Sequence, residues 1–210
     1  MKRRALLLAL LAAPLTPAWA QSPALTAQDR ADIARVEAYL DRLKTLKAHF
    51  LQVGPDGDVS EGTAWIDRPG KMRFEYSPPS PYLLVAGYGV GFFHDKSLGQ
   101  TSNFPVSASP LGILLDEHVH LSGDVSITAV NRLPGQLQLT LIHTGNPGKG
   151  SITLIFADQP LALKQWVIDD AQHRSTSVSL YDVALGGTFD ANLFQFADPK
   201  LLKPRDSTGG

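Results

Sequence analysis

The sequence predicts a mainly β fold with a few helices (α+β), built as a barrel or a strongly curved antiparallel sheet. Roughly ten short segments between residue 47 and the end read as strands at hairpin spacing. Clusters of Gly, Pro, Asn and Asp separate most of them. One amphipathic helix precedes the strands, and one short apolar helix interrupts them in mid-chain.

Residues 1–20 have the order of a secretory signal peptide. Lys2, Arg3 and Arg4 precede an apolar run over 5–13, and Ala18-Trp19-Ala20 fits an A-x-A cleavage site. The run is too short to span a bilayer, which disfavours a retained anchor. The arginine pair matches twin-arginine export only in part, so the general secretion route is favoured. We therefore predict cleavage after Ala20 and a mature domain over 21–210.

The composition excludes several classes of protein. The chain of 210 residues has 19 basic and 20 acidic side chains, and cleavage leaves 16 basic ones, a formal charge of −4. Nucleic-acid binding would need clustered excess Lys and Arg. The chain has no Cys, so disulfides, thiol chemistry and lipid attachment through Cys are all impossible.

Residues 26 to about 46 are predicted to form the first helix. Thr26 and Asp29 have capping-box spacing. Apolar side chains then recur at steps of three and four, which places one apolar stripe along a helix: Ile33, Val36, Leu40, Leu43 and Leu46.

The strands are recognised by alternation and by their turns. Lys71–Tyr76 alternates strictly, with Met72, Phe74 and Tyr76 on one face. The predicted strands are 62–67, 71–76, 82–86, 90–94, 124–130, 136–143, 151–156, 163–168 and 175–183, with a further one over 194–196. A strand from about 47 follows the first helix.

A short helix is predicted after Ser109, which would cap it, with Pro110 at its first position. Its side chains Leu111, Ile113, Leu114 and Leu115 are almost all apolar. Such a helix is either an ordinary buried core helix or a lid that closes an apolar site.

The alternation leaves one further alternative open. An antiparallel sheet with one wet face must cover its apolar face, and two helices are available to cover a large curved sheet. The ordinary outcome is a filled core, because close-packed interiors are the rule. The other outcome is a cavity that the helices only partly plug, since barrels of this size can hold a ligand.

Several motifs, in order and spacing, resemble the LolA family of lipoprotein carriers. The central one runs from Gly62 to Tyr76, with the Arg68-Pro69 pair, and is followed by Ser77-Pro78-Pro79. Phe50-Leu51-Gln52 resembles the family's F-x-Q. The other similar segments are Gly87–Asp95, Gln100-Thr101, Pro110–Leu115, Arg174–Val183 and Phe194-Gln195-Phe196. Ala86-Gly87 and Phe92-Phe93 depart from the family's usual Asp-Gly and Trp.

The resemblance implies an incomplete antiparallel β-barrel with a helical lid over a hydrophobic cavity. It implies a periplasmic, non-enzymatic carrier that takes lipoprotein acyl chains from the inner to the outer membrane without a cofactor. It also implies two partners besides acylated lipoproteins: an inner-membrane ABC transporter that releases them and, if present, an outer-membrane lipoprotein receptor. We expect a monomer that binds no nucleic acid.

The resemblance also implies the site residues. Arg68 would latch the lid over the empty cavity; taken alone, it would read as a solvated charge at a strand end. Leu111, Ile113, Leu114 and Leu115 would form the lid. The cavity would be lined by Phe50, Trp65, Met72, Phe74, Tyr76, Leu84, Phe92, Leu137 and Leu139.

Rival chemistry is poorly supported by the sequence. On a strand, His118 and His120 would share a face, but no third ligand at recognisable spacing completes a metal site. His94-Asp95 lacks a G-x-S-x-G elbow, so a hydrolase is disfavoured. Residues 145–150 lack the Walker spacing. One alternative of another class remains: a periplasmic lipid-binding or lipoprotein-sensing module that acts through a protein partner.

Overall fold

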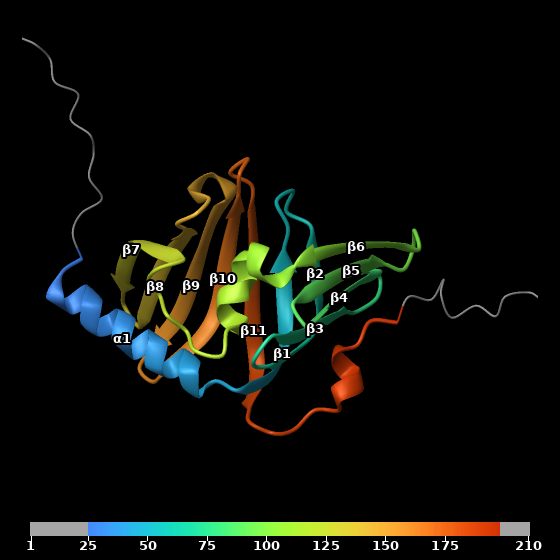
Figure 1. Ribbon diagram of the computed structural model, residues 1–210, viewed down its shortest axis with the longest axis horizontal. Coiled ribbons are helices and arrows are strands. Elements are labelled where there is room, and N and C mark those ends of the chain that lie inside the picture. Colours follow the sequence, from blue (N-terminus) through green and yellow to red (C-terminus); the bar gives the residue numbers. More distant parts are fainter. Residues whose placement is uncertain (1–24, 198–210) are drawn as a thin grey trace, which may run out of the picture.

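The computed structural model describes residues 25–197, and the predicted signal peptide lies outside them. Eleven strands form one antiparallel sheet in the order β6-β5-β4-β3-β2-β1-β11-β10-β9-β8-β7. The sheet curves around an apolar inner face, and β6 and β7 are its two edges (Figure 1). The strands are β1 Thr45–Val53, β2 Val59–Asp67, β3 Lys71–Tyr76, β4 Tyr82–Gly87, β5 Val90–Asp95, β6 Gln100–Pro105, β7 Val125–Leu133, β8 Gln136–His143, β9 Gly150–Asp158, β10 Leu161–Asp170 and β11 Ser175–Leu185.

The predicted mainly β fold with an incomplete barrel is therefore confirmed. The strands form two meanders, β1–β6 and β7–β11, which are joined where β1 pairs with β11. The helices are α1 (Ala27–Arg42) and four short 3₁₀ segments, η1 (Val106–Ala108), η2 (Pro110–Leu115), η3 (Pro147–Lys149) and η4 (Ala191–Phe194). Within residues 25–197 no helix is long and apolar enough to cross a membrane.

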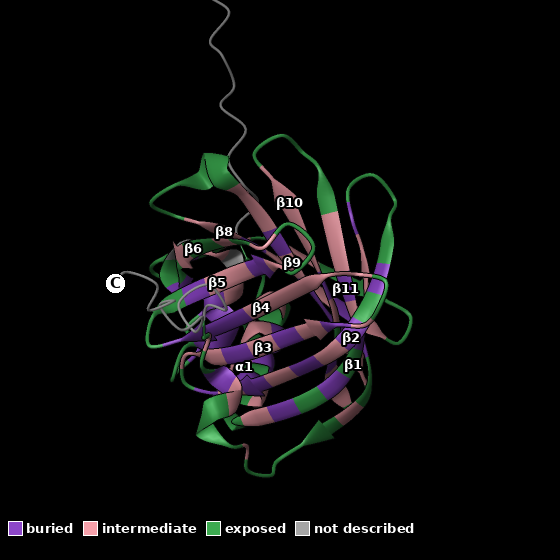
Figure 2. Cartoon of the chain, turned by 90° about the vertical axis from the view of Figure 1, so that its right-hand side faces the viewer, coloured by how far each residue is buried: buried purple, intermediate pink, exposed green. Residues whose placement is uncertain are grey.

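Alternation along each strand determines which side chains enter the core. In β3, Met72, Phe74 and Tyr76 are buried, and the residues between them are half-buried. Figure 2 shows the same change from buried to less buried residues along β1 and β2. The two-residue period thus gives the sheet a dry concave face and a wetter convex face.

Helix α1 begins with the predicted capping box and ends earlier than predicted. The Thr26 hydroxyl accepts from the Asp29 amide at 3.1 Å, and the Asp29 carboxylate accepts from the Thr26 amide at 2.8 Å. The helix ends at Arg42 rather than near residue 46. Leu46 continues the helical spacing of apolar residues, but it belongs to β1, where it lies between Ile66 and Leu185.

One strand was missed by the sequence analysis, and one predicted strand was wrong. Gln100–Pro105 forms the edge strand β6, which the sequence did not indicate. Phe194-Gln195-Phe196 forms no strand, because Ala191–Phe194 is a 3₁₀ turn that packs against β3 and β4. A polar edge strand lacks the apolar alternation that identifies a half-buried strand.

An ion-pair cluster fixes α1 to strand β7. The buried carboxylate of Asp32 accepts from Arg132 Nε at 2.7 Å and from Arg35 at 2.8 Å. Burial raises the pKa of Asp32, but the hydrogen bonds from Arg132, Gln28 and Arg35 outweigh it and leave that pKa below its ordinary value. Hydrogen bonds from Thr26 and Arg132 lower the pKa of Asp29 to about 2.

This cluster predicts a loss of stability in acid. A carboxyl whose pKa is lower in the folded state stabilises the fold above its unfolded pKa, near 3.8 here, and stops doing so as pH falls through the folded pKa. The melting temperatures of the wild type and of Arg132→Gln should therefore differ at pH 5 and converge as pH falls from about 4 to 2. Thermal melts followed by circular dichroism check this. A difference that stays constant over that range would show that these carboxyls are not linked to folding.

Gly62 of β2 leaves no room for a side chain, because strand β3 and the Phe50 ring pack against its backbone. A Cβ there would lie 2.1 Å from the Glu75 carbonyl oxygen and 2.8 Å from the Phe50 ring. Gly62→Ala should therefore destabilise the protein by about 1–3 kcal/mol or more, because the backbone of β3 at Glu75 would have to move to make room for the new methyl group. Gly145→Ala is the matched control, since a Cβ there meets nothing within 4 Å. Equal urea midpoints for the two variants would contradict this packing.

Candidate functional site: an apolar concave face closed by a lid

Aromatic rings form the centre of the concave face. The ring of Phe50 lies 5.2 Å from Phe74 and 5.0 Å from Tyr76, measured between centroids. Tyr76 in turn lies 5.7 Å from Tyr82, which is 5.3 Å from Phe93. The Tyr76 hydroxyl donates to Gln52 at 2.8 Å, and burial raises the pKa of Tyr76 to about 12. A nearly continuous aromatic surface thus crosses β1, β3, β4 and β5.

Most of the residues predicted to line the cavity lie together on this face. Phe50, Met72, Phe74, Tyr76, Leu137 and Leu139 are buried in one apolar cluster, and Leu84 packs at its margin. That cluster also contains Ile113, Leu114 and Leu115, with Leu111 against it. The sheet and the lid therefore share one core.

Trp65 and Phe92 do not belong to this face. Trp65 lies between the buried residues Ala64 and Ile66 of β2, so its side chain leaves the sheet on the convex side, where Lys47 Nζ lies 5.8 Å from the ring. Phe92 stacks on Phe196 of the C-terminal segment at 5.2 Å. The assignment of both residues to the cavity was wrong, because successive side chains of a strand point to opposite faces.

The predicted lid is the 3₁₀ helix η2. The Ser109 hydroxyl caps it by accepting from the Leu111 amide at 3.3 Å. In Figure 1 the segment lies across the open side of the sheet, between the two meanders. The Leu115 carbonyl accepts from the Gly70 amide at 2.8 Å, which attaches the end of the lid to the β2–β3 turn.

The segment after the lid is attached to α1 by two carboxylates. The Val119 amide donates to Asp41 and the Leu121 amide donates to Glu37, both at 2.8 Å. The sequence did not indicate these roles, because both acids occupy positions that a helix normally presents to solvent. They order residues 116–121 as a strap between the lid and β7.

Arg68 joins all of these parts. Its guanidinium is buried and donates to the carbonyls of Leu40 and Leu43 (3.0 Å for Leu43) at the end of α1. It also donates through Nε to the Asp116 carbonyl at 2.8 Å, just after the lid. The Glu117 carbonyl accepts at 3.5 Å. One side chain at the end of β2 therefore holds the helix terminus and the lid terminus together.

Arg68 is a buried cation whose hydrogen-bond partners are backbone carbonyl oxygens rather than carboxylates. Burial lowers the pKa of Arg68, and the charges of Asp41 and Asp116 oppose that shift. Burial likewise raises the pKa of the Asp116 carboxyl. An arginine stays charged in proteins, and its five donors in a rigid fork suit several carbonyls at once. The guanidinium thus adds donors at the end of α1, where the last carbonyls of a helix lack their usual helical partners.

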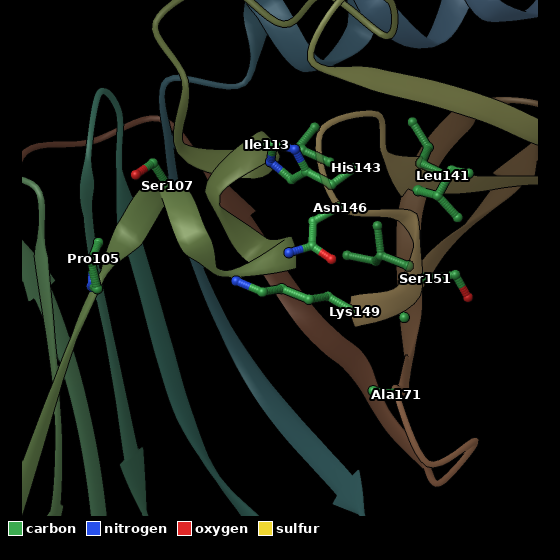
Figure 3. A pocket seen from close by; sticks show the side chains of 12 residues that line it. Pro105, Ser107, Ile113, Leu141, His143, Asn146, Lys149, Ser151 and Ala171 are labelled. Atoms are coloured by element: carbon green, nitrogen blue, oxygen red, sulfur yellow. The ribbon is translucent and has the colours of Figure 1, made fainter.

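A cavity opens at the mouth of the concave face, beside the lid. Its volume is about 460 Å³, within the range of small-molecule pockets. Figure 3 shows Ile113 of η2 and Leu141 of β8 on either side of it. Ile152 of β9 also lines it, as do the exposed residues Asn146 and Lys149 of the β8–β9 connection. An apolar space with a polar rim is suited to an amphiphilic ligand.

Two other sites were weighed in the sequence: a metal site at His118 and His120 and a hydrolytic site at His94. His118 and His120 are both exposed, and among residues 25–197 no group of three or more His, Cys, Asp or Glu side chains could hold a metal ion. His94 Nδ1 lies 3.0 Å from the Thr101 hydroxyl, and its ring packs on Phe196.

Comparison with known proteins gives the family. The family model described as outer membrane lipoprotein carrier protein LolA matches residues 41–197. This chain belongs to the LolA family. The matched span includes Arg68, η2 and all eleven strands, and it leaves out all of α1 except residues 41 and 42. The sheet, Arg68 and η2 therefore lie within the part of the chain that shows the family.

Two curated relatives support this assignment, and one solved structure shares the fold. An outer-membrane lipoprotein carrier protein of Methylococcus capsulatus is 27% identical over 175 residues, which cover 79% of this chain and 83% of that one. One of Azotobacter vinelandii is 27% identical over 213 residues, with 94% and 95% covered. A DUF1329 family protein from Desulfovibrio piger, 9% identical, covers 84% of this chain and 98% of its own with a TM-score of 0.50, which shows a shared fold alone.

Proposed function

We propose that this LolA-family protein is a periplasmic carrier that shelters the acyl chains of lipoproteins and takes them from the inner to the outer membrane. The observation that carries the proposal is the Arg68 contact. It holds a lid and a helix end closed over a continuous apolar face through hydrogen bonds that a movement of the lid can break. The names of the curated relatives agree with lipoprotein carriage.

The energetics explain why such a carrier is needed. Each methylene transferred out of a membrane costs about 0.8 kcal/mol. An acyl chain of about 15 methylenes therefore resists entering water by roughly 12 kcal/mol. At about 1.4 kcal/mol per factor of ten, free transfer is negligible. The carrier must offer an apolar surface comparable to the bilayer, and a lid that opens gives access to it.

Release has to be driven by partners. The chain carries no Walker motif, so a nucleotide-driven step belongs to another protein. In this proposal an inner-membrane ABC transporter loads the carrier, which is non-enzymatic and monomeric. An outer-membrane receptor, where one exists, accepts the lipoprotein.

Lipoprotein release from spheroplasts tests the proposal. Purified mature protein is incubated with spheroplasts, and the supernatant is probed for an outer-membrane lipoprotein in one-to-one complex with it. We expect release that disappears when the lipoprotein lacks its acyl chains. No release by well-folded protein, or a stable complex with a signalling protein in its place, would favour the sensing module and contradict the carrier.

A further inference from the structure

The indole of Trp166 has an unused hydrogen-bond donor inside the core. Trp166 is 1% exposed, and within residues 25–197 its Nε1 has no hydrogen-bond partner. Buried donors in native proteins are nearly always paired, and an unpaired one is destabilising. This donor therefore calls for an explanation.

The neighbours of Trp166 offer no acceptor side chain. On β10 it lies opposite Leu154 of β9 and Val178 of β11, and its ring packs edge-on against Phe74 at 6.1 Å. Two tyrosine hydroxyls of the core already have partners. The Tyr76 hydroxyl donates to Gln52, and the Tyr39 hydroxyl accepts from the Leu163 amide. The indole N–H remains available on the concave face.

Trp166 lies just below the cavity that opens beside η2. Leu141 and Ile152 line that cavity and are paired across β8 and β9. The next pair on the same face, two residues further along each strand, is Leu139 and Leu154, and Trp166 lies opposite Leu154. At about 3.3 Å per residue, Trp166 is one row, or roughly 7 Å, deeper than the cavity wall.

We propose that Trp166 Nε1 donates a hydrogen bond to the ester or amide carbonyl at the head of a bound acyl chain. The inference rests on the proposed function and specifies its ligand chemistry. An acyl chain carries its carbonyl next to the head group, so a head group at the rim of the cavity leaves the carbonyl a short way inside. The hydrocarbon beyond it offers no acceptor and requires none, because the residues that flank Trp166 on this face, Leu154, Val178 and Phe74, are apolar.

Tryptophan NMR tests the proposal directly. The mature chain contains two tryptophans, Trp65 on the convex face and Trp166 on the concave face. Protein labelled with ¹⁵N at the indole is titrated with dihexanoyl phosphatidylcholine and with its dihexyl ether analogue, both below their micelle concentrations. We expect the ester to shift the Trp166 indole proton downfield and slow its exchange with solvent. The ether should do neither, and Trp65 should respond to neither ligand.

Affinity gives a second measurement. The ester should bind about three- to tenfold more tightly than the ether, the size expected for one net hydrogen bond. Trp166→Phe should abolish that preference, and Trp65→Phe, the matched control, should keep it. Circular dichroism verifies that both variants fold. Should Trp166→Phe not fold, the NMR titration of the wild type decides.

The outcomes separate this proposal from the carrier function. Binding of both ligands without an ester preference, or with equal shifts of the Trp166 signal, overturns the role of Trp166 and leaves the carrier untouched. Binding of neither ligand overturns it too, because no acyl chain then reaches this face. Lipoprotein release from spheroplasts is read independently of all these results.

Discussion

Arg68→Leu is expected to keep its lipoprotein bound and to slow transfer to an acceptor membrane by at least about tenfold. The Arg68 guanidinium donates to carbonyls at the ends of α1 and η2, and in the proposed carrier cycle these hydrogen bonds form again as the ligand leaves. Hydrogen bonds to a charged group contribute about 1.5–3 kcal/mol each. Without them the closed empty state rises in free energy relative to the loaded state, so the ligand is retained. A two-membrane transfer assay measures the rate.

The control for this variant is Arg174→Leu. Arg174 is an exposed arginine paired with Asp170 in the β10–β11 hairpin, and among residues 25–197 its side chain makes no hydrogen bond to α1 or η2. It should transfer lipoprotein at the wild-type rate. Unchanged handover by Arg68→Leu, with normal loading, would show that these hydrogen bonds support the fold without controlling the lid.

Phe50→Ala is expected to lower the free energy of unfolding by about 3–5 kcal/mol, as for other buried aromatic truncations. Phe50 is fully buried and contacts Phe74, Tyr76 and the backbone around Gly62. For a domain of this size the melting temperature should fall by roughly 6–20 °C. Calorimetry provides the measurement, and Val59→Ala on an exposed strand position is the control.

The same variant addresses whether the core is filled or loosely packed. The rings of Phe74 and Tyr76 are in contact with Phe50, which favours a large cost of truncation. A cost below about 1 kcal/mol would instead indicate an interior that collapses easily around a lost ring. Such an interior would need no lid movement to admit an acyl chain.

The sequence predicted the elements whose patterns are uniform. Strict alternation located β3 within its observed bounds, and the Thr26–Asp29 spacing located the start of α1. The end of α1 was misplaced because Leu43 and Leu46 continue the helical spacing while facing the same core from outside the helix. Strand β6 was missed because hydrogen bonding to β5, rather than apolar burial, holds its polar residues in the sheet.

The sequence predicted most residues of the candidate site, but it misassigned two aromatic residues and missed two carboxylates. Trp65 and Phe92 were assigned to the cavity because they are aromatic residues in the segments that resemble the family. The pairing of β2 with β3 and of β4 with β5 places their side chains on the convex face. Counting from Phe74 across the ladder would have selected Phe93 in place of Phe92. The contacts of Glu37 and Asp41 with the strap could not be predicted, because they join segments about 80 residues apart whose relative position only the fold determines.

The pairing of β1 with β11 has a consequence for how the chain acquires its structure. Each meander can form from hairpins between neighbouring segments, which are fast local events. The seam between the meanders joins residues 46–53 to residues 177–185 and needs almost the whole chain. Closing so long a loop is slow, so a nascent chain exposes both apolar faces until β11 has emerged. A protein built to shelter other molecules' acyl chains is thus itself exposed to aggregation during synthesis.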